Sequence, residues 1–135
     1  MAAKIRVKCP HCGEVENVHS EVGICSKCKQ PYDFSGGGSI YLYRQGSPLG
    51  VAGGFGIYIN SQPCGHIGNK ELLRIPVQYG TYNLHVAAGM SRRCQDMQVT
   101  ITPQCPVAYT KVHMRPGFWT NSFVIEPVDP NLLDL

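Results

Sequence analysis

Four cysteines near the N-terminus have the type and spacing of metal ligands. They form two Cys-x-x-Cys hooks, Cys9-Pro-His-Cys12 and Cys25-Ser-Lys-Cys28. Each hook can present two sulfurs to one ion from a single tight turn, and two hooks together complete a tetrahedron of thiolates without an open position. Zinc favours this ligand set. We therefore predict one structural Zn²⁺, bound by Cys9, Cys12, Cys25 and Cys28.

Other chemistry is open to the same residue types. Paired cysteines at this spacing could form two disulfides or a redox-active pair, and four thiolates can also hold iron, as in rubredoxin. His11 and His19 are spare ligands in the same stretch, and we interpret both as bystanders. The paired spacing favours zinc, although the interval between the hooks is slightly shorter than usual.

The stretch that carries the hooks is too short to fold around a hydrophobic core alone. Residues 1–34 contain few apolar side chains, and chains below roughly 40 residues usually need a metal, disulfides or a partner. Zinc is therefore expected to supply much of the folding free energy. Gly13, directly after the first hook, stands where a positive φ is often needed.

The same stretch resembles the short zinc ribbons that begin many bacterial proteins. The resemblance rests on the Cys-Pro-x-Cys-Gly and Cys-x-x-Cys knuckles at 9–13 and 25–28. It implies a metal site and leaves the partner open, because such ribbons serve nucleic-acid binding, protein docking and plain structural ends.

Charge argues against a strong nucleic-acid interface on this ribbon. The whole chain of 135 residues has a formal net charge of only +3. In residues 1–34 the basic side chains (Lys4, Arg6, Lys8, Lys27, Lys29) are nearly balanced by acidic ones (Glu14, Glu16, Glu21, Asp33). Binding to a phosphate backbone needs a clear excess of positive charge.

The rest of the chain has the pattern of short strands joined by turns. Glycine and proline are abundant, with 15 and 10 residues, and no segment has a helical period. Apolar residues alternate in several stretches, for example Ile40 and Leu42 against Tyr41 and Tyr43. We predict an all-β protein: a zinc ribbon at 1–34, a Gly/Ser linker at 35–39, a seven- or eight-stranded antiparallel β-sandwich at 40–128 and a C-terminal tail at 129–135.

Residues 39–127 resemble PEGA-like β-sandwich domains and a family of uncharacterised bacterial β-sandwich domains. The motifs are a Ser-Ile-Tyr-Leu-Tyr-Arg strand at 39–44, a hairpin beginning Phe55-Gly-Ile-Tyr-Ile-Asn60, a strand within 77–86 and a closing Phe-Val-Ile-Glu-Pro-Val-Asp at 123–129. The resemblance implies a non-catalytic β-sandwich whose ligand is unknown.

Three cysteines and a set of aromatic side chains lie outside the ribbon. Cys64 with His66 could form half of a second metal site, and Cys94 could form a disulfide with Cys105; buried free thiols are the simpler interpretation. Tyr41, Tyr43, Tyr58 and His85 are expected to share one sheet face, which could bind a sugar or peptide or form a subunit contact.

The cellular compartment and the functional class of the protein are inferred mainly from features that the sequence lacks. The N-terminus has no apolar run typical of a secretory signal, and no stretch approaches the ~20 apolar residues of a membrane helix. An odd number of cysteines, seven, is typical of a reducing compartment. We expect a cytoplasmic protein, and the histidines are too scattered to indicate an enzyme.

We therefore expect a non-enzymatic protein in which a structural zinc ribbon is tethered to a β-sandwich that binds another protein or self-associates through its edge strands. One alternative is a nucleic-acid-binding ribbon with the β domain as an oligomerisation body. Another is a redox or electron-transfer role for the four cysteines.

Overall fold

The computed structural model describes residues 3–45, 55–87, 93–94, 96–115 and 122–133. Within these residues the secondary structure is β-strand, apart from one short 3-10 helix, η1 (Pro130–Leu133). The prediction of an all-β protein is confirmed. The described residues contain no helix that is long and apolar enough to cross a membrane.

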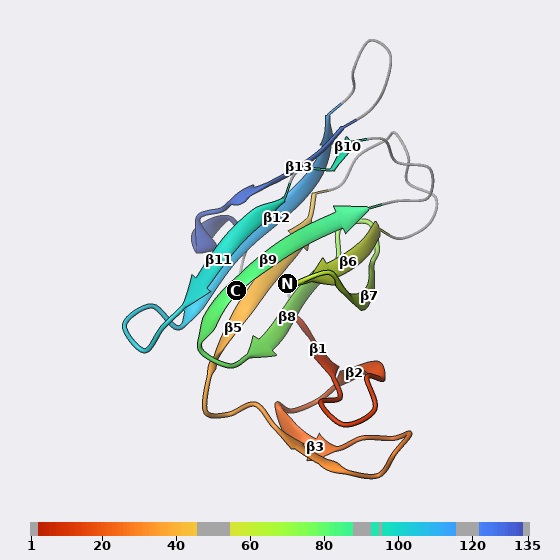
Figure 1. Cartoon of the computed structure of the whole chain (residues 1–135). Helices are drawn as coiled ribbons and strands as arrows, with labels where there is room; N and C mark the ends of the chain where they lie inside the picture. Colours follow the sequence, from red (N-terminus) through yellow and green to blue (C-terminus); the bar gives the residue numbers. More distant parts are fainter. Residues whose placement is uncertain (1–2, 46–54, 88–92, 95, 116–121, 134–135) are drawn as a thin grey trace.

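The strands form three sheets (Figure 1). The largest sheet has, in spatial order, β10 (Arg93–Cys94), β13 (Ser122–Pro127), β12 (Val107–Arg115), β5 (Gly38–Arg44), β8 (Leu72–Val77), β1 (Lys4–Lys8) and β2 (Val15–Val18). The second sheet has β11 (Met97–Ile101), β9 (Gly80–Ala87), β6 (Phe55–Ile59) and β7 (Gln62–Ile67). The third is a hairpin of β3 (Val22–Ile24) and β4 (Pro31–Asp33).

One hydrophobic core joins the two larger sheets. Alternation places Ile40 and Leu42 of β5 in this core, together with Leu84 and Val86 of β9, and all four side chains are fully buried. Figure 1 shows β9 lying across the face of the sheet that contains β5. The alternation of apolar and polar residues in the sequence therefore matches the alternation of buried and less buried side chains along these strands.

In the part of the chain that the structure describes, three strand pairs are parallel, whereas the sequence suggested an antiparallel arrangement. These pairs are β1 with β8, β5 with β12 and β10 with β13. Their partners are far apart in the chain, so no hairpin turn sets their direction. Nine strands, β5 to β13, also fall in the described part of residues 38–127, where seven or eight were expected.

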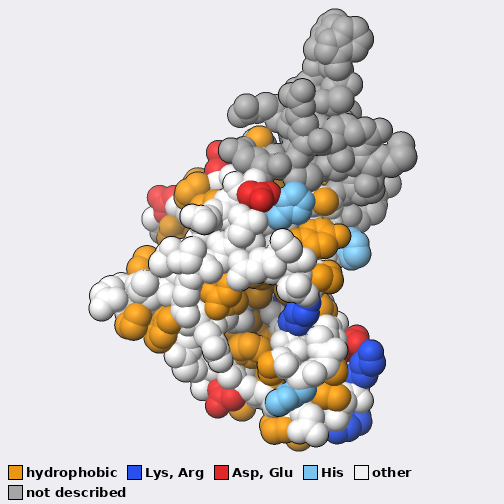
Figure 2. Space-filling model, viewed as in Figure 1, with side chains coloured by type: hydrophobic (Ala, Val, Ile, Leu, Met, Phe, Trp, Pro, Cys, Tyr) orange, Lys and Arg blue, Asp and Glu red, His pale blue; other side chains and the backbone are white. Residues whose placement is uncertain are grey.

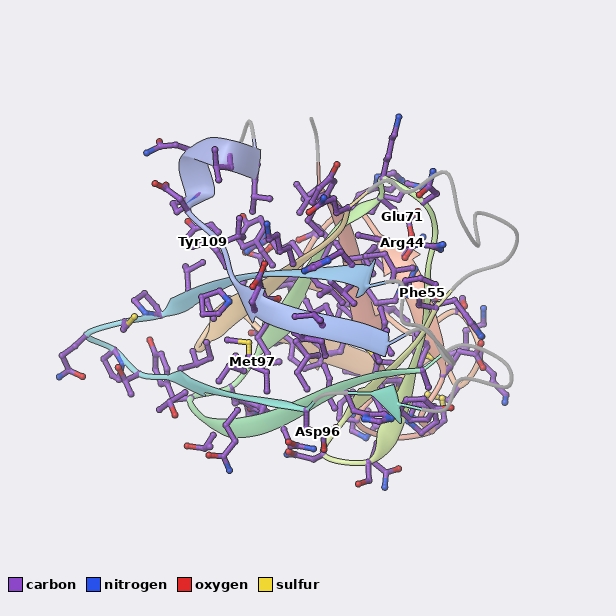
Figure 3. The ribbon with its side chains drawn as sticks, turned by 90° about the horizontal axis from the view of Figure 1, so that it is seen from above. Arg44, Phe55, Glu71, Asp96, Met97 and Tyr109 are labelled. Carbon is purple, nitrogen blue, oxygen red and sulfur yellow. The ribbon has the colours of Figure 1, made fainter. Side chains whose placement is uncertain are left out.

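A buried arginine connects the two larger sheets at one end of the core. The guanidinium carbon of Arg44, in β5, lies 3.6 Å from the centroid of the Phe55 ring in β6. Its Nη1 donates a hydrogen bond of 3.1 Å to the carbonyl of Ile67 in β7. Figure 3 shows Arg44 and Phe55 together at this end of the molecule.

The second half of the glycine-rich stretch that suggested a linker is closely packed. Gly38 and Ser39 belong to β5. A Cβ on Gly37 would lie 2.1 Å from the Val77 carbonyl oxygen, and one on Gly38 would lie 1.9 Å from that of Pro106. Glycine is needed at these two positions because backbone approaches backbone. The division of the chain into a ribbon, a linker and a β-sandwich domain stays a prediction.

The C-terminal segment is partly ordered against the body of the protein. Within the stretch expected as a tail, 129–135, helix η1 buries the side chain of Leu133. The Val128 N–H also donates a hydrogen bond of 3.0 Å to the carbonyl of Tyr109.

Candidate metal centre

The two Cys-x-x-Cys hooks bring their four sulfurs together. The Sγ atoms of Cys9, Cys12, Cys25 and Cys28 all lie within 4.8 Å of one another. Cys9 Sγ is 3.6 Å from Cys28 Sγ, and Cys12 Sγ is 3.6 Å from Cys25 Sγ. A tetrahedral zinc with Zn–S bonds of about 2.3 Å requires sulfurs roughly 3.8 Å apart. The distances are far too long for disulfides and close to those of a four-thiolate metal site.

The first hook is a tight turn that begins at Cys9. The Cys9 Sγ accepts a hydrogen bond of 3.4 Å from the His11 N–H, and the Gly13 N–H donates one of 3.0 Å to the Cys9 carbonyl. The Cys9 N–H donates in turn to the Glu14 carbonyl at 2.8 Å. Gly13 has a φ of 80°, as the sequence suggested.

The second hook forms the same three hydrogen bonds as the first. The Lys27 N–H donates to Cys25 Sγ at 3.4 Å, the Lys29 N–H donates to the Cys25 carbonyl at 3.0 Å, and the Cys25 N–H donates to the Gln30 carbonyl at 3.0 Å. Lys29 occupies the position of Gly13, with a φ of 65°. A lysine there is strained, and sequence reasoning did not identify it as a turn residue with positive φ.

The close packing of the thiols separates the pKa values of Cys9 and Cys28. Burial opposes ionisation of Cys9, but hydrogen bonds from the backbone N–H groups of Cys12 and His11 and from the thiols of Cys28 and Cys12 together lower the pKa of the Cys9 thiol to about 6. At Cys28 the Gln30 N–H favours the thiolate, yet burial and the neighbouring sulfurs raise the pKa to about 12. Without a cation the four groups cannot all ionise near neutral pH, so a bound metal must displace protons.

Side chains around the hooks hold them to the neighbouring strands. Ser26, inside the second hook, donates from Oγ to the Glu16 carboxylate on β2 at 2.5 Å. The His11 ring Nε2 lies 3.2 Å from the Pro31 carbonyl oxygen at the start of β4. The group of four ligand atoms includes neither His11 nor His19, as expected for bystanders.

Comparisons with protein-family models, with curated proteins and with solved structures find no match. The resemblances noted for the ribbon and for residues 39–127 therefore stay predictions. The evidence for the candidate metal centre is the geometry of its four cysteines.

The basic residues of β1 connect the metal-binding stretch to the body of the protein. Arg6 is buried; its Nη1 donates to the carbonyls of Cys64 and His66 at 3.2 and 2.7 Å, and its Nε donates to Asn17 Oδ1 at 2.7 Å. Lys8 Nζ donates to the Pro63 carbonyl at 2.8 Å.

A third cation of the same strand completes this attachment. Lys4 Nζ pairs with the Glu71 carboxylate at 2.8 Å. Lys4, Arg6 and Lys8 alternate along β1, so they share one side of the strand. A local sequence pattern could not show that their partners lie about sixty residues away, on β7 and in the turn before β8.

Among the described side chains, the cysteines outside the hooks do not join the cluster of four. Cys64 is buried in β7, where burial raises the pKa of its thiol. Cys105 is an exposed free thiol in the turn before β12. Cys94 lies in β10, which pairs through β13 with the far end of β12. A Cys94–Cys105 disulfide would therefore have to span the length of β12.

The aromatic side chains expected on one sheet face lie on two. Tyr41 is in β5 and stacks on Tyr109 of the neighbouring β12, with ring centroids 5.1 Å apart. Tyr58 and His85 are in β6 and β9 of the other large sheet, with ring centroids 5.8 Å apart. The alternation identified the outward side chains correctly, but it could not assign strands to sheets.

Proposed function

We propose that the protein is a non-enzymatic, zinc-stabilised binding module. The convergence of four thiols at tetrahedral spacing carries the proposal. One Zn²⁺ bound by all four would have no open position for a substrate, so its role is structural. It would hold the hooks together and thereby fix both β1, which joins the large sheet, and the β3–β4 hairpin.

The β3–β4 hairpin is the docking surface that we assign to this module. Among the described residues, four large hydrophobic side chains are exposed, and two of them, Val22 and Ile24, stand on the same side of β3 at 48% and 65% exposure. Pro31, opposite Ile24 in the register, is exposed too. Hydrophobic side chains reach the surface at the lower end of the molecule in Figure 2, where Figure 1 places β3.

The partner in this proposal is another protein chain, either a second copy or a different protein. A neighbouring apolar surface would remove Val22 and Ile24 from water. The sequence suggested edge strands of the sandwich instead; the exposed apolar side chains favour the hairpin.

A nucleic-acid partner receives less support from the contacts of the basic residues. Lys4, Arg6 and Lys8 all bind groups of the same chain. Lys27 is exposed but lies 3.5 Å from the Glu14 carboxylate. A phosphate backbone would have to compete for these side chains.

The docking surface is tested with one polar substitution and a matched control. Sedimentation velocity compares the zinc-loaded wild type with Ile24→Ser and with Leu132→Ser, which changes an equally exposed apolar side chain outside the hairpin. Self-association that Ile24→Ser weakens and Leu132→Ser does not would support the proposal.

A different protein as partner is tested by placing a photo-crosslinking residue at 24 or at 132 in cells of the source organism. A discrete adduct that forms from position 24 alone, and is lost with Val22→Ser, is expected. A monomeric protein with no adduct specific to position 24 would contradict the docking surface and leave the metal centre as the remaining part of the proposal.

A further inference from the structure

The outer face of the four-stranded sheet carries a polar hollow that the metal centre and the hairpin do not use. Its volume is about 410 Å³, within the range of small-molecule sites. It is lined by Tyr58, Ser61, Asn83, His85, Ala87 and Asp96. In Figure 2 an acidic and a histidine side chain lie side by side on this face.

Three of these side chains form a hydrogen-bonded network between β9 and the residue that precedes β11. His85 Nδ1 donates to Asp96 Oδ1 at 2.5 Å, and Asn83 Nδ2 donates to Asp96 Oδ2 at 3.0 Å. The bonds from Asn83 and His85 lower the pKa of the Asp96 carboxyl. Figure 3 shows Asp96 on the outer side of the sheet while its neighbour Met97 points into the core. The network leaves His85 Nε2 and Asn83 Oδ1 available to a ligand.

Tyr58 provides a flat aromatic surface beside this network. It stands directly opposite His85 in the register of β6 and β9. A Cβ on Gly56, two residues earlier on the same side of β6, would lie 3.4 Å from the Tyr58 ring. The ring therefore lies next to a residue without a side chain, and it lines the hollow.

The available polar groups define the chemistry of the ligand. Within the described residues, the Tyr58 hydroxyl, the Ser61 hydroxyl, His85 Nε2 and Asn83 Oδ1 have no protein hydrogen-bond partner. They mix donors and acceptors, as the hydroxyl groups of a polyol do. The described lining contains one carboxylate and neither Lys nor Arg, which disfavours anions. The aromatic face, with its partial negative charge, attracts the C–H groups of a sugar ring.

We propose that this hollow binds a neutral carbohydrate. One sugar ring packs on Tyr58, and its hydroxyl groups hydrogen-bond to His85, Asn83 and Ser61. Asp96 does not contact the sugar; it positions His85 and Asn83. The metal ligands lie in turns and not on this sheet, and the docking surface is on β3, so the site is separate from both.

Titration of the ¹⁵N-labelled, zinc-loaded full chain tests the proposal by NMR. The probes are glucose, galactose, mannose, N-acetylglucosamine and their β-linked disaccharides, with glucosamine and glucuronate as charged counterparts. We expect saturable shifts of the amides around Tyr58 and His85 with at least one neutral sugar. Shifts with glucosamine alone, with glucuronate alone, or with no sugar at all would overturn the proposal.

Three variants locate the binding. Tyr58→Ala should weaken the best sugar about tenfold or more, whereas Tyr58→Phe keeps the ring and should weaken it less. Thr81→Ala, on the same sheet face but outside the hollow, should leave affinity unchanged. Thermal unfolding of each variant confirms that the fold is retained. An affinity that Tyr58→Ala does not change would also overturn the proposal.

Discussion

At the scale of single residues, the two hooks show that the cysteine cluster is built from two turns of the same geometry. Both hooks use the same three backbone hydrogen bonds. They differ at the residue that must adopt a positive φ, which is glycine in one hook and Lys29 in the other. A residue with a Cβ atom loses about 1–2 kcal/mol of stability in this backbone conformation, whereas glycine does not.

The strain at Lys29 can be measured by substitution. We expect Lys29→Gly to leave the free energy of unfolding unchanged or to raise it by up to about 1 kcal/mol, because relief of strain offsets the added freedom of the unfolded chain. Lys27→Gly is the matched control: it removes the same charge from the same hook at an ordinary φ, and should destabilise. Urea unfolding of the zinc-loaded proteins gives both values. Equal losses from the two substitutions would contradict the strained turn.

Gly65 lies so close to Arg6 that a side chain at position 65 should destabilise the protein. Gly65 has a φ of 76°, and a Cβ there would lie 2.7 Å from Arg6 Nη1. Gly65→Ala should therefore lower the free energy of unfolding by about 2–4 kcal/mol, through backbone strain and loss of the buried Arg6 hydrogen bonds. Gly68→Ala, where nothing lies within 4 Å, is the control.

A double-mutant cycle separates the contact from the strain. With Arg6→Ala already present, Gly65→Ala should cost less, with a coupling of about 1 kcal/mol or more. Strictly additive losses would show that the two residues do not interact.

At the scale of elements, the start of β5 depends on glycines for packing. Gly37 and Gly38 lie against backbone carbonyl oxygens, whereas nothing lies within 4 Å of a Cβ on Gly36. Gly38→Ala should lower the free energy of unfolding by about 3 kcal/mol or more, because the clash is with rigid backbone, and Gly36→Ala should be nearly neutral. Thermal or urea unfolding measures both. Similar, small effects at the two positions would indicate that the stretch is a spacer.

The same segment illustrates what sequence reasoning can and cannot reach. Local patterns predicted that the cysteines at 9, 12, 25 and 28 form one cluster and that Ile40 and Leu42 are buried, because spacing and alternation are properties of neighbouring residues. The parallel pairing of β1 with β8 and the buried contacts of Arg6 depend on residues sixty positions apart. Composition made Gly37 and Gly38 look flexible, because it cannot report which backbone lies beside them.

At the scale of the whole molecule, the metal centre and the body are mechanically connected. Strand β1 leads from the large sheet directly into the first hook. It pairs with β8, and Lys4, Arg6 and Lys8 attach it to β7 and to the turn before β8. Removing the metal with a chelator should therefore lower the midpoint of thermal unfolding and raise amide exchange in β7 and β8 as well as in the hooks. Exchange that rises only in residues 9–34 would show that the two parts fold separately.

Metal affinity should depend steeply on pH. A thiol must lose its proton to bind metal, and in the metal-free state the pKa of Cys28 is about 12 and that of Cys12 is also raised. These two groups are protonated below pH 8, so protons compete with metal and affinity falls as pH falls. Between pH 8 and pH 6 the logarithm of the dissociation constant should change by more than one per pH unit. A competition titration with a chromophoric chelator measures this slope, and a slope near zero would contradict binding by several protonated thiols.

The most direct test of the account is metal content, measured by elemental mass spectrometry on protein purified without added metal. The account predicts one zinc per chain in a colourless wild-type protein, and loss of that zinc in Cys25→Ser but not in Cys105→Ser, which changes an exposed thiol outside the centre. Iron in place of zinc, or a metal-free protein with the four cysteines joined in disulfides, would contradict the structural zinc site.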